Sequence, residues 1–384
     1  MKKRSSSPAD TARRLRTATK KVVRRHGIDS ASISEIVRVA GLTTGSVYGR
    51  FESREDLLLH VWDEDAGAAI LGRLESRLRD WRDAVIPGAA PADLSESEEF
   101  GLQMMAVSGR IQYIGETVRN DVSKFLQKHS AVQADDQIKA GEALVLALEL
   151  ARMFYQGVRK DAEDWSLAAR VFDDVARRLE TVLEPRSLET SQSRLPSTGE
   201  TYDLVRSCRH VVSQTGLENA TLCRIARGAG VTTGSIFAQF ETREDFIRDS
   251  IAQLFAGAAT QVDRRIVESQ GKAVLSVALG GLLAISEDSH RREWNAFRTE
   301  CFLSARSTPF VRTALRSVLN SGRHRYEELL LPTTGFKPDY LGGVTVVGQA
   351  LPVGLHILNT VSPTVARLTQ TRSVELLLEA IGVI

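Results

Sequence analysis

The sequence is short of cysteine and proline, and each shortage narrows the kinds of protein it can encode. Its 384 residues contain only three cysteines, Cys208, Cys223 and Cys301. An odd, scattered set forms no disulfide framework and lacks the spacing of a zinc site. We interpret the three as small apolar residues in the helices of a protein from a reducing compartment, because nothing in their spacing supports a redox switch. With only 10 prolines, long helices are permitted.

Membrane and export signals are also scarce. No apolar stretch follows the N-terminal residues 1–7, so we expect no signal peptide. Residues 341–361 contain no Asp, Glu, Lys or Arg and would be long enough to span a bilayer. However, Gln349, Pro352, His356 and four glycines lie within them. We therefore predict a buried helix with a proline kink, no membrane contact and a cytoplasmic protein.

Motifs of catalysis are missing from the sequence. It contains no Walker loop, no G-x-S-x-G elbow, no H-E-x-x-H motif and no paired cysteines. We expect no enzymatic activity, no cofactor and no metal site. The net charge of +2 does not by itself indicate a nucleic-acid partner.

What the sequence does contain is an internal repeat. Residues 27–56 and 216–245 align without a gap at an offset of 189, and 15 of the 30 positions are identical. The identities include Gly41-x-Thr-Thr-Gly-Ser46 and its match Gly230-x-Thr-Thr-Gly-Ser235. The chain therefore holds two copies of one unit. Between them, residues 186–201 are rich in Ser, Thr and Pro, a composition typical of a linker.

Helical periodicity dominates the sequence, and no convincing strand pattern of period 2 is present. Residues 164–183 place apolar residues on one face, and the segment before them, 143–158, is apolar almost all round. The second copy ends in the same way, with the apolar segment 341–361 and then a helix that begins near Pro363. A helix pair at the end of each copy predicts that the copies pack together as a helical bundle.

The repeated unit has the pattern of a DNA-binding helix-turn-helix. In the first copy we expect a helix over 11–26 that Gly27 ends, and a short helix over 32–40. A turn over 41–43 should lead to a short helix over 44–51, capped by Thr43, and Ser53 should begin the next helix. Two short helices joined by a glycine turn can enter a major groove.

These residues resemble the DNA-binding domain of TetR-type regulators. The family's pattern falls here on Gly41, Thr43, Gly45, Tyr48, Phe51 and Ser53-Arg54-Glu55, and in the second copy on Gly230, Thr232, Gly234, Phe237, Phe240 and Thr242-Arg243-Glu244. The resemblance implies an all-α fold of two tandem units, each with a helix-turn-helix domain (1–60, 202–249) and a helical ligand-binding and dimerisation domain (61–185, 250–384). Because family members usually homodimerise, the chain looks like a fused dimer, an intramolecular pseudo-dimer.

The resemblance also implies which residues contact DNA. It assigns phosphate contacts to Thr43, Tyr48 and Arg54 and base contacts to Thr44, Ser46 and Arg50, with Gly45 between them. In the second copy the corresponding residues are Thr232, Phe237 and Arg243, then Thr233, Ser235 and Gln239, with Gly234 between them. Arginine can bridge guanine O6 and N7, whereas glutamine suits adenine. The alternatives are a packed aromatic for Tyr48 and a solvated charge for Arg50; Val47 and Phe51 should be core residues.

The two copies differ in charge. Residues 1–60 carry 13 Lys or Arg and 6 Asp or Glu, which gives +7, whereas residues 188–249 carry 7 and 8, which gives −1. Phosphate neutralisation supplies most sequence-independent affinity, so the first copy should bind DNA strongly. Either both modules bind and read an asymmetric operator, or the second serves as dimerisation scaffold or sensor. The first reading is favoured because the second copy retains Thr232-Thr233-Gly234-Ser235.

The family usually senses a small molecule in its helical C-terminal part, which implies an apolar effector of unknown identity and, by family habit, a repressor. Candidate ligand contacts are Met104, Met105, Tyr113, Phe125, Met153, Phe154 and Tyr155 in the first copy, and Trp294, Phe297, Phe302, Phe310, Tyr326 and His356 in the second. The alternative for every one of them is ordinary core packing. A further homodimer and an adaptor that does not bind DNA also stay open.

Overall fold

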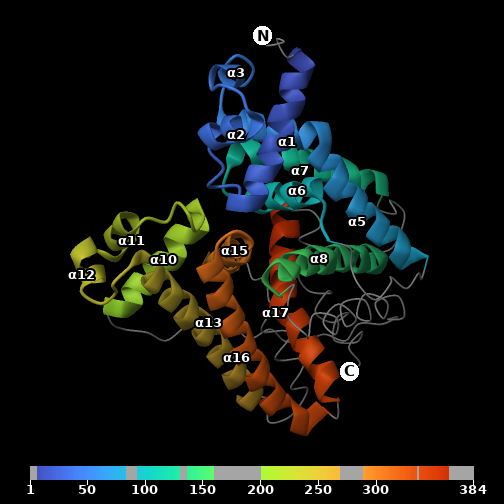
Figure 1. Cartoon of the computed structure of the whole chain (residues 1–384). Helices are drawn as coiled ribbons and strands as arrows, with labels where there is room; N and C mark the ends of the chain where they lie inside the picture. The colour runs from blue at the N-terminus through green and yellow to red at the C-terminus, as the bar shows by residue number, and fades with distance from the viewer. Residues whose placement is uncertain are drawn as a thin grey trace.

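Every regular element in the described part of the chain is a helix. The computed structural model describes residues 7–83, 93–129, 136–159, 200–268, 289–334 and 337–362. It confirms the predicted all-α class, and Figure 1 shows the two small helix-turn-helix modules at the edge of a larger helical body. The predicted helix over 164–183 and the last helix, from Pro363, lie outside the described residues.

The first module consists of α1 (Pro8–His26), α2 (Ile33–Ala40), α3 (Gly45–Tyr48) and α4 (Arg54–Val61). Ser7, Ser32 and Ser53 cap α1, α2 and α4, each with its hydroxyl accepting a backbone N–H. Leu15, Val22 and Ile36 are fully or almost fully buried between the helices, as the periodicity predicts.

The rest of the first unit is a helical body. The π-helix η1 (Trp62–Ala66) joins α4 to α5 (Gly67–Arg82), followed by α6 (Glu96–Val107), α7 (Gln112–His129) and α8 (Asp136–Arg159). Two acids of η1 hold α1 in place, because Arg16 pairs with Glu64 at 3.0 Å and Lys20 pairs with Asp65. These ion pairs, together with the apolar core, hold the first module against the body.

The second unit repeats this order with different lengths. Its module comprises α10 (Glu200–Thr215), α11 (Leu222–Ala229), α12 (Thr233–Phe237) and the start of α13 (Arg243–Glu268). The body continues with α15 (Ser289–Ser304), α16 (Pro309–Thr334) and α17 (Pro338–Val361). Here α13 runs as one helix past the position where the first unit has its π-helix.

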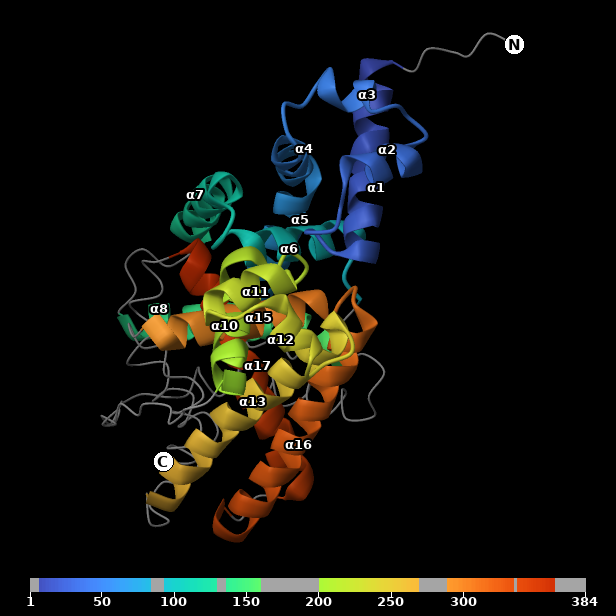
Figure 2. The ribbon, with the colours of Figure 1, turned by 90° about the vertical axis from the view of Figure 1, so that its left-hand side faces the viewer.

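The two units share a core where α8 and α17 cross and pack against each other (Figures 1 and 2). The backbones come unusually close at Gly354, where an added Cβ would lie 1.9 Å from the Ala147 carbonyl oxygen. The apolar segment 341–361 is therefore a buried helix of the shared core, as predicted, although its length and composition would also suit a membrane span. Pro352 lies inside this helix.

One face of α8 is polar, which differs from our prediction that this segment is apolar almost all round. Glu142, Glu149 and Gln156 recur every seven residues, and all three are buried. Arg82 of α5 pairs with Glu142, and Arg73 donates to Glu149 at 2.9 Å. The buried acids are stable because arginines of α5 meet them, a pairing that helix periodicity alone does not reveal.

Candidate nucleic-acid interface

A left-handed glycine makes the turn in each module. Gly41 ends α2 with φ +62°, and Gly230 ends α11 with φ +72°. These backbone angles are strained for residues with a Cβ, so glycine is required at both positions. In the first module Arg14 of α1 also donates to the Ala40 carbonyl at 2.6 Å, which satisfies the open end of α2.

The predicted cap of the recognition helix is present in one module only. The Thr232 hydroxyl accepts from the Ser235 N–H at 3.3 Å and caps α12. In the first module α3 is shorter than the predicted 44–51, and Thr44 occupies the N-cap without a side-chain bond. Thr43 instead lies 3.2 Å, hydroxyl to hydroxyl, from Ser46. The prediction that Thr43 caps this helix is therefore wrong, because α3 begins one residue later in the chain than α12 does.

Both recognition helices present an aromatic ring to solvent. Tyr48 is 63% exposed and Phe237 is 56% exposed, whereas Val47 and Ile236, one position earlier, are fully buried. Phe51 is also buried, as predicted. The alternative of a packed aromatic at Tyr48 is therefore wrong. An exposed ring beside small polar residues is available to a ligand as large as DNA.

The residues predicted to read bases are exposed or half-buried and lie at the start of each short helix or just after its end. Arg50 is exposed and donates to the Ser46 carbonyl at 3.1 Å. Gln239 is exposed in the same place and donates to the Ser235 carbonyl at 3.3 Å. Thr44 and Gly45 are exposed and Ser46 is half-buried. In the second module Gly234 is exposed, and Thr233 and Ser235 are half-buried. The two helices thus present different side chains on one common frame.

Arg54 and Arg243 point inward instead of outward. Arg54 donates to the Ala31 carbonyl at 2.8 Å and to the Ile28 carbonyl, so it holds the loop between α1 and α2. Arg243 donates to the Leu217 carbonyl at 2.6 Å and repeats the arrangement. Our prediction assigned both to phosphates and did not foresee this structural contact. Arginine occupies this position in both copies, which indicates that the residue has a role. The sequence does not distinguish a phosphate contact from a structural contact.

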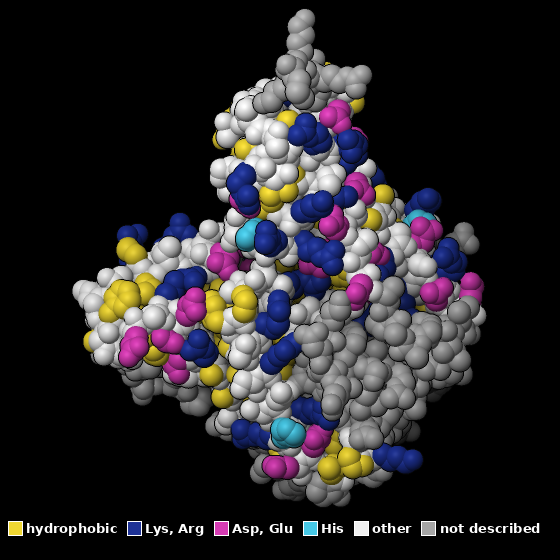
Figure 3. Space-filling view, viewed as in Figure 1, with side chains coloured by type: hydrophobic (Ala, Val, Ile, Leu, Met, Phe, Trp, Pro, Cys, Tyr) yellow, Lys and Arg dark blue, Asp and Glu magenta, His cyan; other side chains and the backbone are white. Residues whose placement is uncertain are grey.

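The exposed charge follows the sequence asymmetry. In Figure 3, Lys and Arg side chains are scattered over the first module and continue down the face toward α16, whereas the second module shows hydrophobic side chains together with charges of both signs. Arg224 and Arg227 of α11 are exposed, so the second module still has cations beside its turn.

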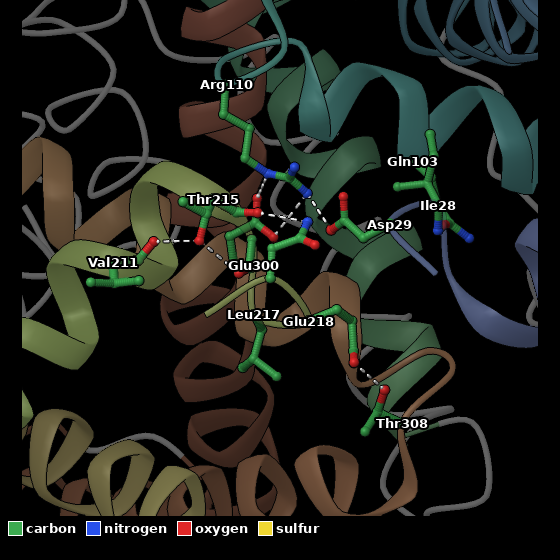
Figure 4. Close-up of polar contacts among 12 residues, drawn as sticks. Ile28, Asp29, Gln103, Arg110, Val211, Thr215, Leu217, Glu218, Glu300 and Thr308 are labelled. Atoms are coloured by element: carbon green, nitrogen blue, oxygen red, sulfur yellow. Dashed lines mark hydrogen bonds and ion pairs between the residues drawn. The ribbon is translucent and has the colours of Figure 1, made fainter. Parts of the chain in front are cut away.

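The loops behind the two modules meet at the seam between the units, where Arg110 binds two acids (Figure 4). Its guanidinium donates to Glu300 of the second unit at 2.7 Å and to Asp29 of the first module at 2.5 Å. Burial opposes this charge, but the two carboxylates outweigh it and raise the pKa of Arg110. Gly216, in the second module's loop, lies so close that a Cβ there would be 2.6 Å from Asp29 Oδ2.

The residues predicted to contact a ligand do not line one site. Met104, Met105, Phe125 and Met153 are buried in the first unit's core, but Tyr113 is 55% exposed on α7 and cannot line an interior cavity. Tyr155 contacts Phe302 at a ring distance of 6.2 Å, and Arg306 lies over Phe154, so both aromatics belong to the seam. Our prediction had placed Phe154 and Phe302 in separate pockets.

In the second unit the aromatic residues form a cluster around a buried cation. Trp294 lies 5.0 Å from Phe255 and 5.9 Å from Phe297, measured between ring centres. Arg298 lies over the Phe255 ring, and burial lowers its pKa to about 10. Tyr326 is also buried, Phe310 packs against the core, and burial lowers the pKa of His356 to about 4.

Two modules with glycine turns and exposed short helices define a DNA-binding regulator of the helix-turn-helix class. A family model described as "Bacterial regulatory proteins, tetR family" matches twice, at residues 15–61 and 204–249. The chain therefore carries the DNA-binding domain of this TetR family twice, in tandem. It is a transcriptional regulator, not an enzyme.

The relatives that we compared each span about half of this chain. The HTH-type transcriptional regulator AcrR of Shigella flexneri is 23% identical over 222 residues, which are 52% of this chain and 99% of that protein. A transcriptional regulator from Rhodococcus sp. Rha1 aligns with a TM-score of 0.38 and 20% identity, over 47% of this chain and 94% of that one. A TetR-family regulator from Rhodococcus sp. aligns with a TM-score of 0.38 and 16% identity, over 48% and 95%.

Proposed function

We propose that the chain reads an asymmetric operator with α3 and α12 and represses transcription until an effector binds. The observation that carries this proposal is that the two recognition helices share a frame and differ in the side chain they present, Arg50 against Gln239. A homodimer has identical recognition helices and reads a palindrome, whereas this chain has two different ones. Arginine favours guanine and glutamine favours adenine, so the two half-sites should differ.

A footprint on the DNA upstream of the chain's own gene, with the mass of the complex recorded, tests the proposal. We expect one chain to protect two dissimilar half-sites separated by about one helical turn. Arg50→Ala should relax specificity in one half-site and Gln239→Ala in the other, each by about tenfold to a hundredfold.

A second candidate function stays open because the second module is less basic than the first. In that case only α3 would read DNA, and the second unit would serve as scaffold or sensor. Protection of a palindrome by two chains, or Gln239→Ala leaving specificity unchanged at every operator position, would support this candidate and exclude the asymmetric reading. Protection of no DNA at all, even at low salt, would favour an adaptor.

The effector part of the proposal rests on the aromatic cluster of the second unit. Arg298 is buried, its Nε has no hydrogen-bond partner, and no carboxylate pairs with it in the described residues. A buried cation of this kind is costly unless it meets an anion, so we expect an apolar effector with one acidic group. Arg298→Met should abolish release from the operator by such an acid but leave operator affinity unchanged. Repression itself is tested by a reporter, whose expression should rise when the gene is deleted.

A further inference from the structure

A cavity of about 320 Å³ lies at the seam between the two units and is distinct from both recognition helices. Its walls combine Arg24 from α1, Glu99 from α6, Gln156 from α8 and three arginines, Arg306, Arg312 and Arg316, from the second unit. Arg24 is in the last turn of α1, whereas α3 lies beside the other end of that helix (Figures 1 and 2). The cavity therefore faces away from the DNA-binding surface. Its volume suits a small metabolite.

Among the described residues that line this cavity, four are arginines and two are acids. Arg306 is neutralised by Glu99, with an Nε–Oε1 distance of 2.6 Å. Arg312 donates to the Ala305 and Arg306 carbonyls, each at 2.7 Å, and Arg316 donates to the Val158 carbonyl at 2.5 Å. For Arg312, which forms no ion pair in the described residues, the carbonyl oxygens fix the direction of the guanidinium without cancelling its charge.

Arg24 adds a further positive charge at the mouth. Its side chain is exposed, and within the described ranges neither it nor Arg312 forms an ion pair. Asp93 is the remaining acid of the wall among the residues that the structure describes. Several guanidinium groups therefore converge on one space with fewer carboxylates to meet them, and such an arrangement favours an oxyanion.

A second, independent observation points to the same space. Gln156 is only 7% exposed, and its Oε1 atom has no hydrogen-bond partner. Its Nε2 donates to Asp93 Oδ1 at 3.3 Å, which fixes Oε1 as the free acceptor. A buried acceptor without a partner costs free energy unless a donor reaches it. A ligand that fills the cavity should therefore carry a hydroxyl or amino group beside its charge.

We propose that this seam cavity binds a small organic anion, a carboxylate or a phosphate that also carries a hydrogen-bond donor. The oxyanion lies among Arg24, Arg312 and Arg316, and the donor reaches Gln156 Oε1. Because these groups come from α1, α8 and α16, the bound anion ties the first module to the second unit. The site is separate from the aromatic cluster around Arg298 and from the residues that face DNA.

Isothermal titration of the full chain without DNA tests this site independently of any operator. Glycerol 3-phosphate and glycerate supply the two kinds of oxyanion together with hydroxyl donors, and glycerol supplies the donors alone. We expect saturable binding of at least one anion and none of glycerol. Propyl phosphate, which lacks hydroxyls, should bind at least about tenfold more weakly than glycerol 3-phosphate if the phosphate is preferred. For glycerate the matching comparison is propionate.

Single substitutions test whether the anion binds in the seam cavity. Arg24→Gln and Arg316→Gln should each weaken the anion at least about tenfold, because each removes a charge-assisted contact. Arg292→Gln removes an exposed arginine of α15 outside the cavity and should leave binding unchanged. If Arg316→Gln fails to fold, Arg24→Gln decides, since that side chain is exposed and makes no ion pair. Absence of saturable binding for both anions, or equal binding by Arg24→Gln and the unaltered chain, would overturn the proposal.

Discussion

At the scale of single residues, two arginines only four positions apart have different roles. Arg50 extends along the outer face of α3, whereas Arg54 turns inward to the loop between α1 and α2. We predict that Arg54→Gln lowers the free energy of unfolding by about 1.5–3 kcal/mol, because charged hydrogen bonds to two carbonyls are lost. Arg243→Gln should behave alike.

The matched control for this prediction is Arg50→Gln. It should change the free energy of unfolding by less than about 0.5 kcal/mol, since the side chain is exposed. Chemical denaturation of the three variants gives the comparison. A normal stability for Arg54→Gln would restore our original interpretation of that residue as a phosphate contact alone.

Glu300 provides a pH-dependent prediction. Burial raises the pKa of Glu300 from its usual 4.5 to about 6, against the attraction of Arg110. Between these two pKa values the folded protein keeps the Glu300 carboxyl protonated, whereas the unfolded chain releases the proton. The stabilisation from this group is therefore fully present below pH 4.5 and is lost as pH rises through 6. Between pH 4.5 and 7 the loss should be about 1–2 kcal/mol.

The comparison with Glu300→Gln isolates this effect from the other acids of the protein. The difference in unfolding free energy, unaltered chain minus variant, should fall as pH rises across that window, because glutamine does not titrate. Other groups, such as Glu149, whose pKa lies near 2 because Arg152 and Arg73 outweigh its burial, contribute equally to both proteins. A difference that stays flat with pH would refute the prediction.

At the scale of elements, the crossing of α8 and α17 depends on one glycine. An added methyl at Gly354 would overlap the Ala147 carbonyl, so the two helices would have to separate. We predict that Gly354→Ala lowers the unfolding free energy by about 3 kcal/mol or more. Thermal and chemical denaturation should both show the loss.

Gly72 on α5 is the control, because a Cβ there meets no atom within 4 Å. Gly72→Ala should raise stability by up to about 1 kcal/mol, since glycine weakens a helix interior. If both substitutions had the same effect, the close approach of α8 and α17 would not be a determinant of stability.

Much of the architecture at this scale was predictable from the sequence. The start of a helix at Ser53, the glycine turn at Gly41 and the buried face of α1 follow from local chemistry, so α1, α2 and the start of α4 lie close to where they were predicted. The start of α3 at Gly45 was not foreseen, because Thr43 and Thr44 can each occupy a cap position. Local pattern could not choose between them.

At the scale of the whole molecule, the predictions missed the contacts across the seam. Arg110 and Glu300 are 190 positions apart, and Arg306 meets Glu99 across 207. Helical periodicity in the sequence does not predict such ion pairs, because they depend on how the two units pack against each other. Tyr155 and Phe302 were assigned to different pockets for the same reason, although the sequence correctly marked both as apolar core candidates.

The shared core predicts that the two units unfold together. Because α8 and α17 are buried against each other, neither unit keeps its apolar surface covered when the other opens. We expect a single calorimetric transition in which the van't Hoff and calorimetric enthalpies agree. Two resolved transitions would mean that the seam contributes little to stability.

The packing of α8 on α17 within one chain also has a consequence for inheritance. In a homodimer every mutation appears twice, so a change in a recognition helix alters both half-sites at once. If both modules read DNA as proposed, a change at Arg50 leaves Gln239 untouched, so the contact of the second module persists while a new first half-site is selected. The proposed regulator would then reach a new target sequence in two steps, each of which keeps one of the two old contacts.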